Sequence, residues 1–112
     1  MTNMTMTRGD TFCVEIEVEG VVESANNLYF VLKQDFDSDE PLIINTLTNE
    51  GAQYLGEEDG STYYEIYIYP EQTEELEPGQ YYYEIKLDFD GAINTVLKGI
   101  LKIEEEVYYV QD

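Results

Sequence analysis

The chain has no histidine, no tryptophan, one cysteine and only five basic residues among 112. Without histidine it lacks the usual general base near neutral pH, which excludes Ser-His-Asp and Cys-His catalytic groups and most zinc sites. No glycine-rich phosphate loop is present either. With 25 acidic residues, some pair of carboxylates falls at any given separation by chance, so such a pair is no sign of a glycosidase. We therefore expect the protein not to be an enzyme.

The single cysteine excludes a disulfide within the chain. Cys13 alternates with Phe12 and Val14, so in a strand it points to the opposite face from these two apolar side chains. The neighbouring Glu15 and Glu17 disfavour a thiolate, which needs a basic neighbour or a helix N-terminus. We expect Cys13 to be a half-buried small hydrophobic residue and not a reactive thiol.

The charge is strongly one-sided, because 25 acidic and five basic residues give a net charge of −20. Nucleic-acid binding is excluded, since neutralising phosphates requires Lys and Arg, and an anionic membrane would repel this surface. No signal peptide is visible in residues 1–6, and no apolar run approaches membrane-spanning length. We expect synthesis in the cytoplasm. Basic partners, cations or solubility alone remain open as reasons for the charge.

Alternation of apolar and polar residues with a period of two dominates the chain, and no long segment has helical periodicity. Strands are predicted at residues 12–19, 28–34, 42–47, 61–69, 81–87 and 93–103, with a short one around residues 53–55 and one helical turn at residues 70–76. The eleven tyrosines and four phenylalanines provide core material that disordered chains lack. These features predict one all-β domain at residues 1–104, an antiparallel sandwich of about seven strands.

Residues 105–112 form a separate C-terminal tail in this interpretation. The tail begins with acidic residues and continues into an apolar cluster that contains Tyr108 and Tyr109. Such a segment is either frayed or docked on its own domain, or it is a strand donated to a partner. Both alternatives stay open, and the second makes Tyr108 and Tyr109 candidate interface residues.

A turn signal at Pro78-Gly79 leads directly into the strand at residues 81–87. Tyr81, Tyr83 and Ile85 share one face of that strand, which predicts that they point into the core. A tyrosine that opens a strand after such a corner is typical of immunoglobulin-like sandwiches, where its hydroxyl bonds back to the corner backbone. The predicted fold is therefore an immunoglobulin-like β-sandwich.

The loop at residues 35–41 has acidic residues at alternate positions, as at the start of a calcium-binding loop. Asp35, Asp37 and Asp39 are the candidate ligands. The pattern then departs from a calcium loop, since Glu40 replaces the turn glycine and Thr46 stands in place of a bidentate glutamate. A solvated acidic loop and a weak calcium site both remain open.

The tripeptide Arg8-Gly9-Asp10 matches an integrin-binding motif, which acts only at an exposed loop tip. Here it immediately precedes the strand at residues 12–19. We interpret it as a turn into that strand.

Several tyrosines alternate with glutamates on faces opposite the predicted core: Tyr63, Tyr67, Tyr69 and Tyr82. Tyrosine on an outward sheet face forms cross-strand pairs, and it is also enriched at protein interfaces. The first interpretation makes these side chains structural. The second predicts one contiguous tyrosine-rich subunit contact that includes Tyr67 and Tyr82.

Four segments in this order resemble a known family: residues 6–12, 28–33, 69–85 and 96–103. The chain is similar, over roughly residues 6–104, to the immunoglobulin-like N-terminal domain of phage baseplate upper proteins. It also resembles small prophage-encoded structural proteins of Gram-positive bacteria that are built on the same domain. The resemblance supplies no catalytic residues. We expect no cofactor, with calcium at the loop of residues 35–41 as the one alternative.

The resemblance implies a structural or assembly role in a phage tail or baseplate, through contacts with other phage structural proteins or with further copies of the chain. It also implies incorporation into the virion after synthesis. The alternative hypothesis is a carbohydrate- or calcium-binding β-sandwich module. Sugar sites combine aromatic rings with Asp or Asn in one concave patch, whereas an assembly face is broad and flat.

Overall fold

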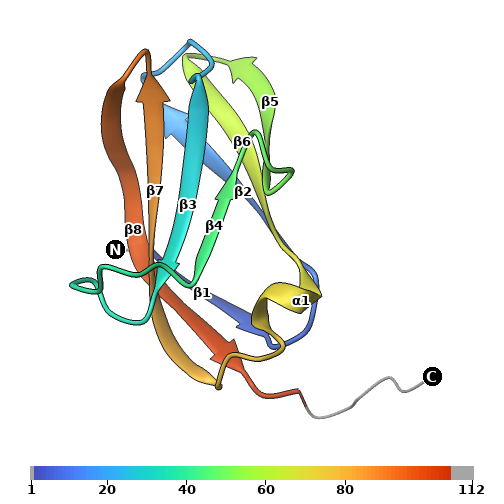
Figure 1. Cartoon of the computed structure of the whole chain (residues 1–112). Coiled ribbons are helices and arrows are strands. Elements are labelled where there is room, and N and C mark those ends of the chain that lie inside the picture. Colours follow the sequence, from blue (N-terminus) through green and yellow to red (C-terminus); the bar gives the residue numbers. More distant parts are fainter. Residues whose placement is uncertain (1, 107–112) are drawn as a thin grey trace.

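The computed structural model describes residues 2–106, which form eight strands and one short helix (Figure 1). The elements are β1 (Thr2–Thr7), β2 (Phe12–Glu19), β3 (Asn27–Lys33), β4 (Ile43–Thr46), β5 (Ala52–Glu58), β6 (Ser61–Ile68), α1 (Pro70–Thr73), β7 (Gly79–Phe89) and β8 (Ala92–Glu104). No helix in this range is long and apolar enough to cross a membrane. The prediction of an all-β domain is confirmed.

The strands form two sheets, a five-stranded sheet in the order β1-β8-β7-β3-β4 and a three-stranded sheet in the order β2-β6-β5. All pairings are antiparallel except that of β1 with β8, which is parallel. The predicted fully antiparallel arrangement of about seven strands is therefore corrected to eight strands with one parallel pair. The unpredicted strand is β1, where Met4 and Met6 alternate with threonines and pack towards the core.

The core lies between the inner faces of the two sheets, where alternate side chains of each strand are buried. Its largest fully buried members are Tyr64, Tyr83, Phe30, Leu28, Leu32, Ile66, Ile68, Ile85, Leu87, Leu101 and Ile103. Phe30 and Tyr83 stack from neighbouring strands with their ring centroids 5.8 Å apart. The alternation predicted the inward faces of β6, β7 and the second half of β8 correctly, because each is a period-two set, whereas β3 is apolar on both faces and its inward face was not predicted.

The corner before β7 is held by Tyr81, which is almost fully buried. Its hydroxyl donates a hydrogen bond to the Glu77 carbonyl oxygen at 2.5 Å. The predicted bond from this tyrosine back to the corner backbone is confirmed. The helix α1 just before the corner is shorter than the predicted turn, since it ends at Thr73.

The buried amide of Asn45 and the half-buried amide of Gln72 connect α1 to the five-stranded sheet. Gln72 Nε2 donates to Asn45 Oδ1 at 2.8 Å, and Asn45 Nδ2 donates to the Tyr67 carbonyl oxygen at 2.6 Å. Gln72 Oε1 in turn accepts from the Tyr69 amide at 2.9 Å. These bonds satisfy the buried side chain of Asn45, where an unpaired amide would be costly.

Candidate interaction surfaces

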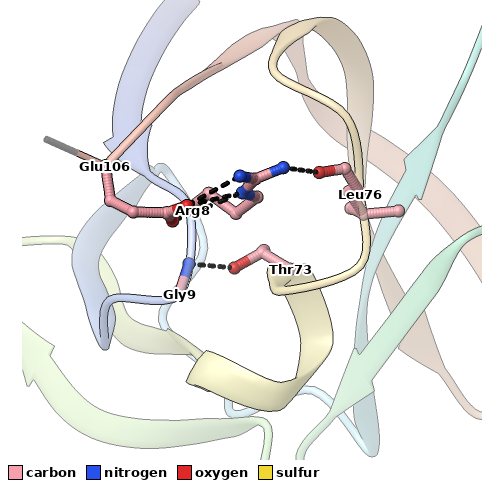
Figure 2. Close-up of polar contacts among 5 residues, drawn as sticks. All are labelled: Arg8, Gly9, Thr73, Leu76 and Glu106. Carbon is pink, nitrogen blue, oxygen red and sulfur yellow. Dashed lines mark hydrogen bonds and ion pairs between the residues drawn. The ribbon is translucent and has the colours of Figure 1, made fainter. Parts of the chain in front are cut away.

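Arg8, the only arginine, joins three segments that are distant in sequence (Figure 2). Its Nη2 lies 2.6 Å from Glu106 Oε1, and its Nε donates to both Glu106 carboxylate oxygens at 3.2 and 3.3 Å. Its Nη1 donates to the Leu76 carbonyl oxygen at 3.2 Å. Beside it, the Gly9 amide donates to Thr73 Oγ1 of α1 at 2.9 Å. Arg8 thus fixes the chain after β8 against the corner that precedes β7.

The tripeptide at residues 8–10 is a turn, as the sequence predicted. The Asp10 amide donates to the Thr7 carbonyl oxygen at 3.2 Å, and Gly9 has a φ of 80°. The Arg8 side chain is only 20% exposed, because it is engaged with Glu106. The guanidinium is therefore not presented to a partner.

Tyr67 and Tyr82 do not share a face, which corrects the prediction of one contiguous tyrosine-rich contact. Tyr67 lies on β6 of the three-stranded sheet and Tyr82 on β7 of the five-stranded sheet. Both alternate with buried residues, so both point away from the core and towards opposite sides of the sandwich. Period-two alternation identifies outward residues but cannot say which sheet a strand joins. Tyr108 and Tyr109 lie outside the described residues.

The outer face of the three-stranded sheet is acidic. It carries Glu15, Glu17, Glu19, Glu58 and Glu65, and none of the basic residues in the described range lies on it. Glu15 and Glu65 stand directly opposite each other on β2 and β6. Like charges in this position repel, so the face favours a cationic neighbour.

Tyr67 is held within this acidic face. Its hydroxyl donates to Glu65 Oε1 and lies 3.2 Å from Gln53 Oε1. The hydrogen bond to Glu65, followed by desolvation and by the Glu65 charge, raises the pKa of Tyr67 to about 12. Partial desolvation and the neighbouring Glu17, Glu58, Asp59 and Glu15 carboxylates also raise the pKa of Tyr63.

The ionisation of Tyr67 should make the stability of the fold depend on pH in the alkaline range. Between the ordinary tyrosine pKa of 10.0 and about 12, the unfolded chain releases the Tyr67 proton while the folded chain keeps it. The unfolded state then binds fewer protons, so the free energy of unfolding falls as the pH rises through this window. We expect tyrosinate absorbance and circular dichroism to change together there. The variant Tyr67→Phe should lose stability less steeply, and an equal slope would contradict the assignment.

Cys13 is exposed and unpaired, so the prediction of a half-buried residue is wrong. It lies on β2, an edge strand of the three-stranded sheet, and its outward face is not covered. Partial desolvation by its neighbours, a hydrogen bond with Glu65 and the charges of Glu65 and Glu15 raise the pKa of the thiol. A raised thiol pKa disfavours the nucleophilic thiolate.

The outer face of the five-stranded sheet carries all four lysines of the chain: Lys33, Lys86, Lys98 and Lys102. In the sheet register Lys33 stands opposite Tyr82, and Lys98 opposite Glu84. Lys86 Nζ also lies 3.6 Å from Glu84 Oε2. The sequence signal for this face is the alternation of lysine with residues that point inward. Because the lysines are confined to one side, the two outer faces of the sandwich differ in charge.

Aromatic and acidic side chains line an open depression at one end of this lysine-bearing face. The Phe36 ring lies over Tyr82 with the centroids 4.4 Å apart. Together with Asp35, Asp37 and Ser38 they line a depression of about 530 Å³. The sequence analysis treats the aspartates as candidate metal ligands and Tyr82 as a candidate interface residue. No sequence pattern indicates that Phe36 contacts Tyr82 and so holds the loop against the sheet.

The structure does not assemble Asp35, Asp37 and Asp39 into a calcium site. Within residues 2–106, no group of three or more His, Cys, Asp or Glu side chains is arranged to hold a metal ion. The three aspartates lie along the loop between β3 and β4. Alternate acidic residues are therefore not sufficient here, because the loop does not curl its carboxylates around one point.

No protein-family model and no curated protein matches the chain.

Proposed function

We propose that the protein is a non-enzymatic structural or assembly protein of a phage or prophage, associated with the tail or baseplate. In this proposal it is an immunoglobulin-like domain that acts through protein–protein contacts with other structural proteins or with further copies of itself. The observation that carries the proposal is the corner at Tyr81. Its hydroxyl bonds to the Glu77 carbonyl oxygen, as in the tyrosine corner of immunoglobulin-like sandwiches, and both residues lie within the resembling segment 69–85.

The order of the strands supports the immunoglobulin-like assignment. The sheets β2-β6-β5 and β8-β7-β3-β4 have the order of strands B-E-D and G-F-C-C′ of that fold. The four resembling segments fall in the turn into β2, in β3, at the corner before β7 and in β8. A sandwich of this kind offers two broad faces and free strand edges, which suit contacts with other proteins.

Immunogold labelling tests the virion assignment directly. Antibodies raised against the purified chain are applied to particles released from the cells that encode it. We expect gold at the tail or at the tail tip, with none after pre-immune serum. Particles that remain unlabelled, while the chain is detected in the lysate, would contradict the proposal.

The corner tyrosine gives a stability prediction. Tyr81→Phe removes the hydroxyl that bonds to Glu77 and leaves the ring in place. We expect the free energy of unfolding to fall by about 1 kcal/mol, the usual net value of such a hydrogen bond. Chemical denaturation measures this, with Tyr82→Phe on the outer face as the matched control. An equal effect of both substitutions would mean that the corner bond contributes nothing.

A carbohydrate-binding module is the second candidate, and the depression beside Tyr82 favours it. Two aromatic rings and two aspartates in one concave patch match the chemistry of a sugar site. Glycan-array binding should then be lost in Tyr82→Ala and retained in Tyr67→Ala, which alters the opposite face. An array without any binding would dismiss this candidate.

A further inference from the structure

An open apolar cleft is lined by residues of β2 from the three-stranded sheet and of β8 from the five-stranded sheet. It has a volume of about 390 Å³. Its walls are Ile16, Val18 and Val21 from the β2 side and Val96 and Leu97 from β8, with Glu17 and Glu19 at the rim. Val21, Val96 and Leu97 remain partly exposed. The core is therefore incompletely covered at this edge.

Both strands that border the cleft have a free backbone edge. Among the described residues, β2 is paired only with β6. Within residues 2–106, β8 pairs with the parallel strand β1 only from Gly99 onwards, so its residues 92–98 pair with β7 alone. Free N–H and C=O groups beside exposed apolar side chains are the features to which an extended segment adds as a strand.

The side chains of β2 set the chemistry of a strand that could be added there. Ile16 and Val18 point into the sandwich, whereas Glu15, Glu17 and Glu19 point outwards along the same strand. Neighbouring strands place directly opposite residues on the same face. An added strand would therefore need apolar residues beside Ile16 and Val18 and cationic residues opposite the glutamates.

A second copy of the chain does not meet this need. Pairing β2 with another β2 would place glutamates against glutamates, and like charges in opposite positions repel. The part of β8 with a free edge, residues 92–98, carries a single lysine, Lys98, so it cannot place cations opposite all three glutamates. Of the other lysines, Lys33 and Lys86 lie on β3 and β7 inside the five-stranded sheet.

We propose that the cleft between β2 and β8 binds an extended segment of a different protein, in which apolar residues alternate with Lys or Arg, as an added strand on β2. This inference names a surface and a partner chemistry for the protein–protein contacts of the proposed function. It therefore rests on that function. The net charge of −20 assists the approach of such a basic segment.

The test uses the full chain, labelled for amide NMR, and a synthetic peptide of alternating Val and Lys as long as β2. We expect the shifted amides to be those of residues 12–19 and 92–98. Peptides of alternating Val and Glu should not bind. The Val–Lys peptide with alternate amides N-methylated should bind much more weakly, because it cannot complete the backbone hydrogen bonds.

Charge reversal separates strand addition from general attraction. Glu15→Lys with Glu19→Lys should weaken binding of the Val–Lys peptide about ten-fold or more, since two close charge pairs become repulsive. Glu17 is left unchanged because its Oε2 accepts a hydrogen bond from Ser61 Oγ at 2.8 Å. The matched control, Glu71→Lys with Glu75→Lys, changes the net charge equally at two exposed positions near α1.

Binding that is lost only in the β2 variant would support the proposal. Absence of binding, or shifts that spread over all acidic surfaces and weaken equally in both variants, would overturn it. The result is independent of immunogold labelling, because the peptide reports on the cleft and the gold reports on the particle. A labelled tail without peptide binding would reject the cleft and leave the proposed function standing.

Discussion

Replacing Gly51 by alanine is expected to lower the free energy of unfolding by about 4 kcal/mol, the sum of two costs. An added Cβ would lie 2.7 Å from Cγ and 2.8 Å from Cα of Asn45, which is closer than such atoms can approach. Overpacking of this kind costs about 1–3 kcal/mol. Asn45 is 2% exposed and bonds to Gln72 and to the Tyr67 carbonyl oxygen, so displacing it leaves buried polar groups unpaired at about 1–3 kcal/mol more.

The control for Gly51 is Gly20→Ala, measured by the same chemical denaturation. No atom lies within 4 Å of a Cβ added at Gly20, whose φ is 79°. Alanine there meets only the backbone cost of the left-handed region, about 1–2 kcal/mol. If both substitutions cost the same, the close contact between Gly51 and Asn45 is not what restricts this turn.

Phe30→Ala is expected to destabilise the fold by about 3–5 kcal/mol, the usual cost of truncating a buried aromatic side chain. Phe30 is fully buried on β3, between β4 and β7, and stacks against Tyr83. The total stability of a domain of this size is about 5–15 kcal/mol, so the substitution should remove a large fraction of it. The thermal melt and the denaturation midpoint measure the loss.

Phe36→Ala is the matched control for Phe30, because it removes the same side chain from the surface. The Phe36 ring contacts Tyr82 on the outer face and is only partly buried. We expect a loss of about 1 kcal/mol, the value of an aromatic pair outside the core. Comparable losses in the two variants would mean that the core is not centred on the inner face of β3.

The alternation of apolar and polar residues is sufficient to predict most of the strands and their inward faces. Tyr81, Tyr83 and Ile85 lie in the core as predicted. The period-two pattern is local, and burial of one strand face follows from it wherever the strand packs. Two strands depart from the prediction: β1 is missed, and β5 is longer than the predicted residues 53–55. The strand β1 lacks a long apolar set, and β5 has its pattern interrupted by a bulge between Tyr54 and Gly56.

The candidate sites depend on more than the local pattern. Asp35, Asp37 and Asp39 lie on one loop as predicted, yet the loop does not bring them together. Phe36, which lies among them, contacts Tyr82 on the sheet instead. Whether loop side chains converge depends on backbone curvature and on the surface beneath the loop, neither of which residue spacing specifies.

The composition by itself determined that no histidine is available and that the surface is acidic. The two-residue alternation by itself determined the all-β class and most of the residues that face inwards. Tertiary structure alone decided that Tyr67 and Tyr82 lie on opposite sides of the sandwich, that the lysines share one face, and that β2 and β8 border an open cleft. The physical reason is the range of the interactions. Which face of a strand is buried follows from neighbours two residues away, whereas the partner of a strand follows from hydrogen bonds and packing between segments far apart in the chain.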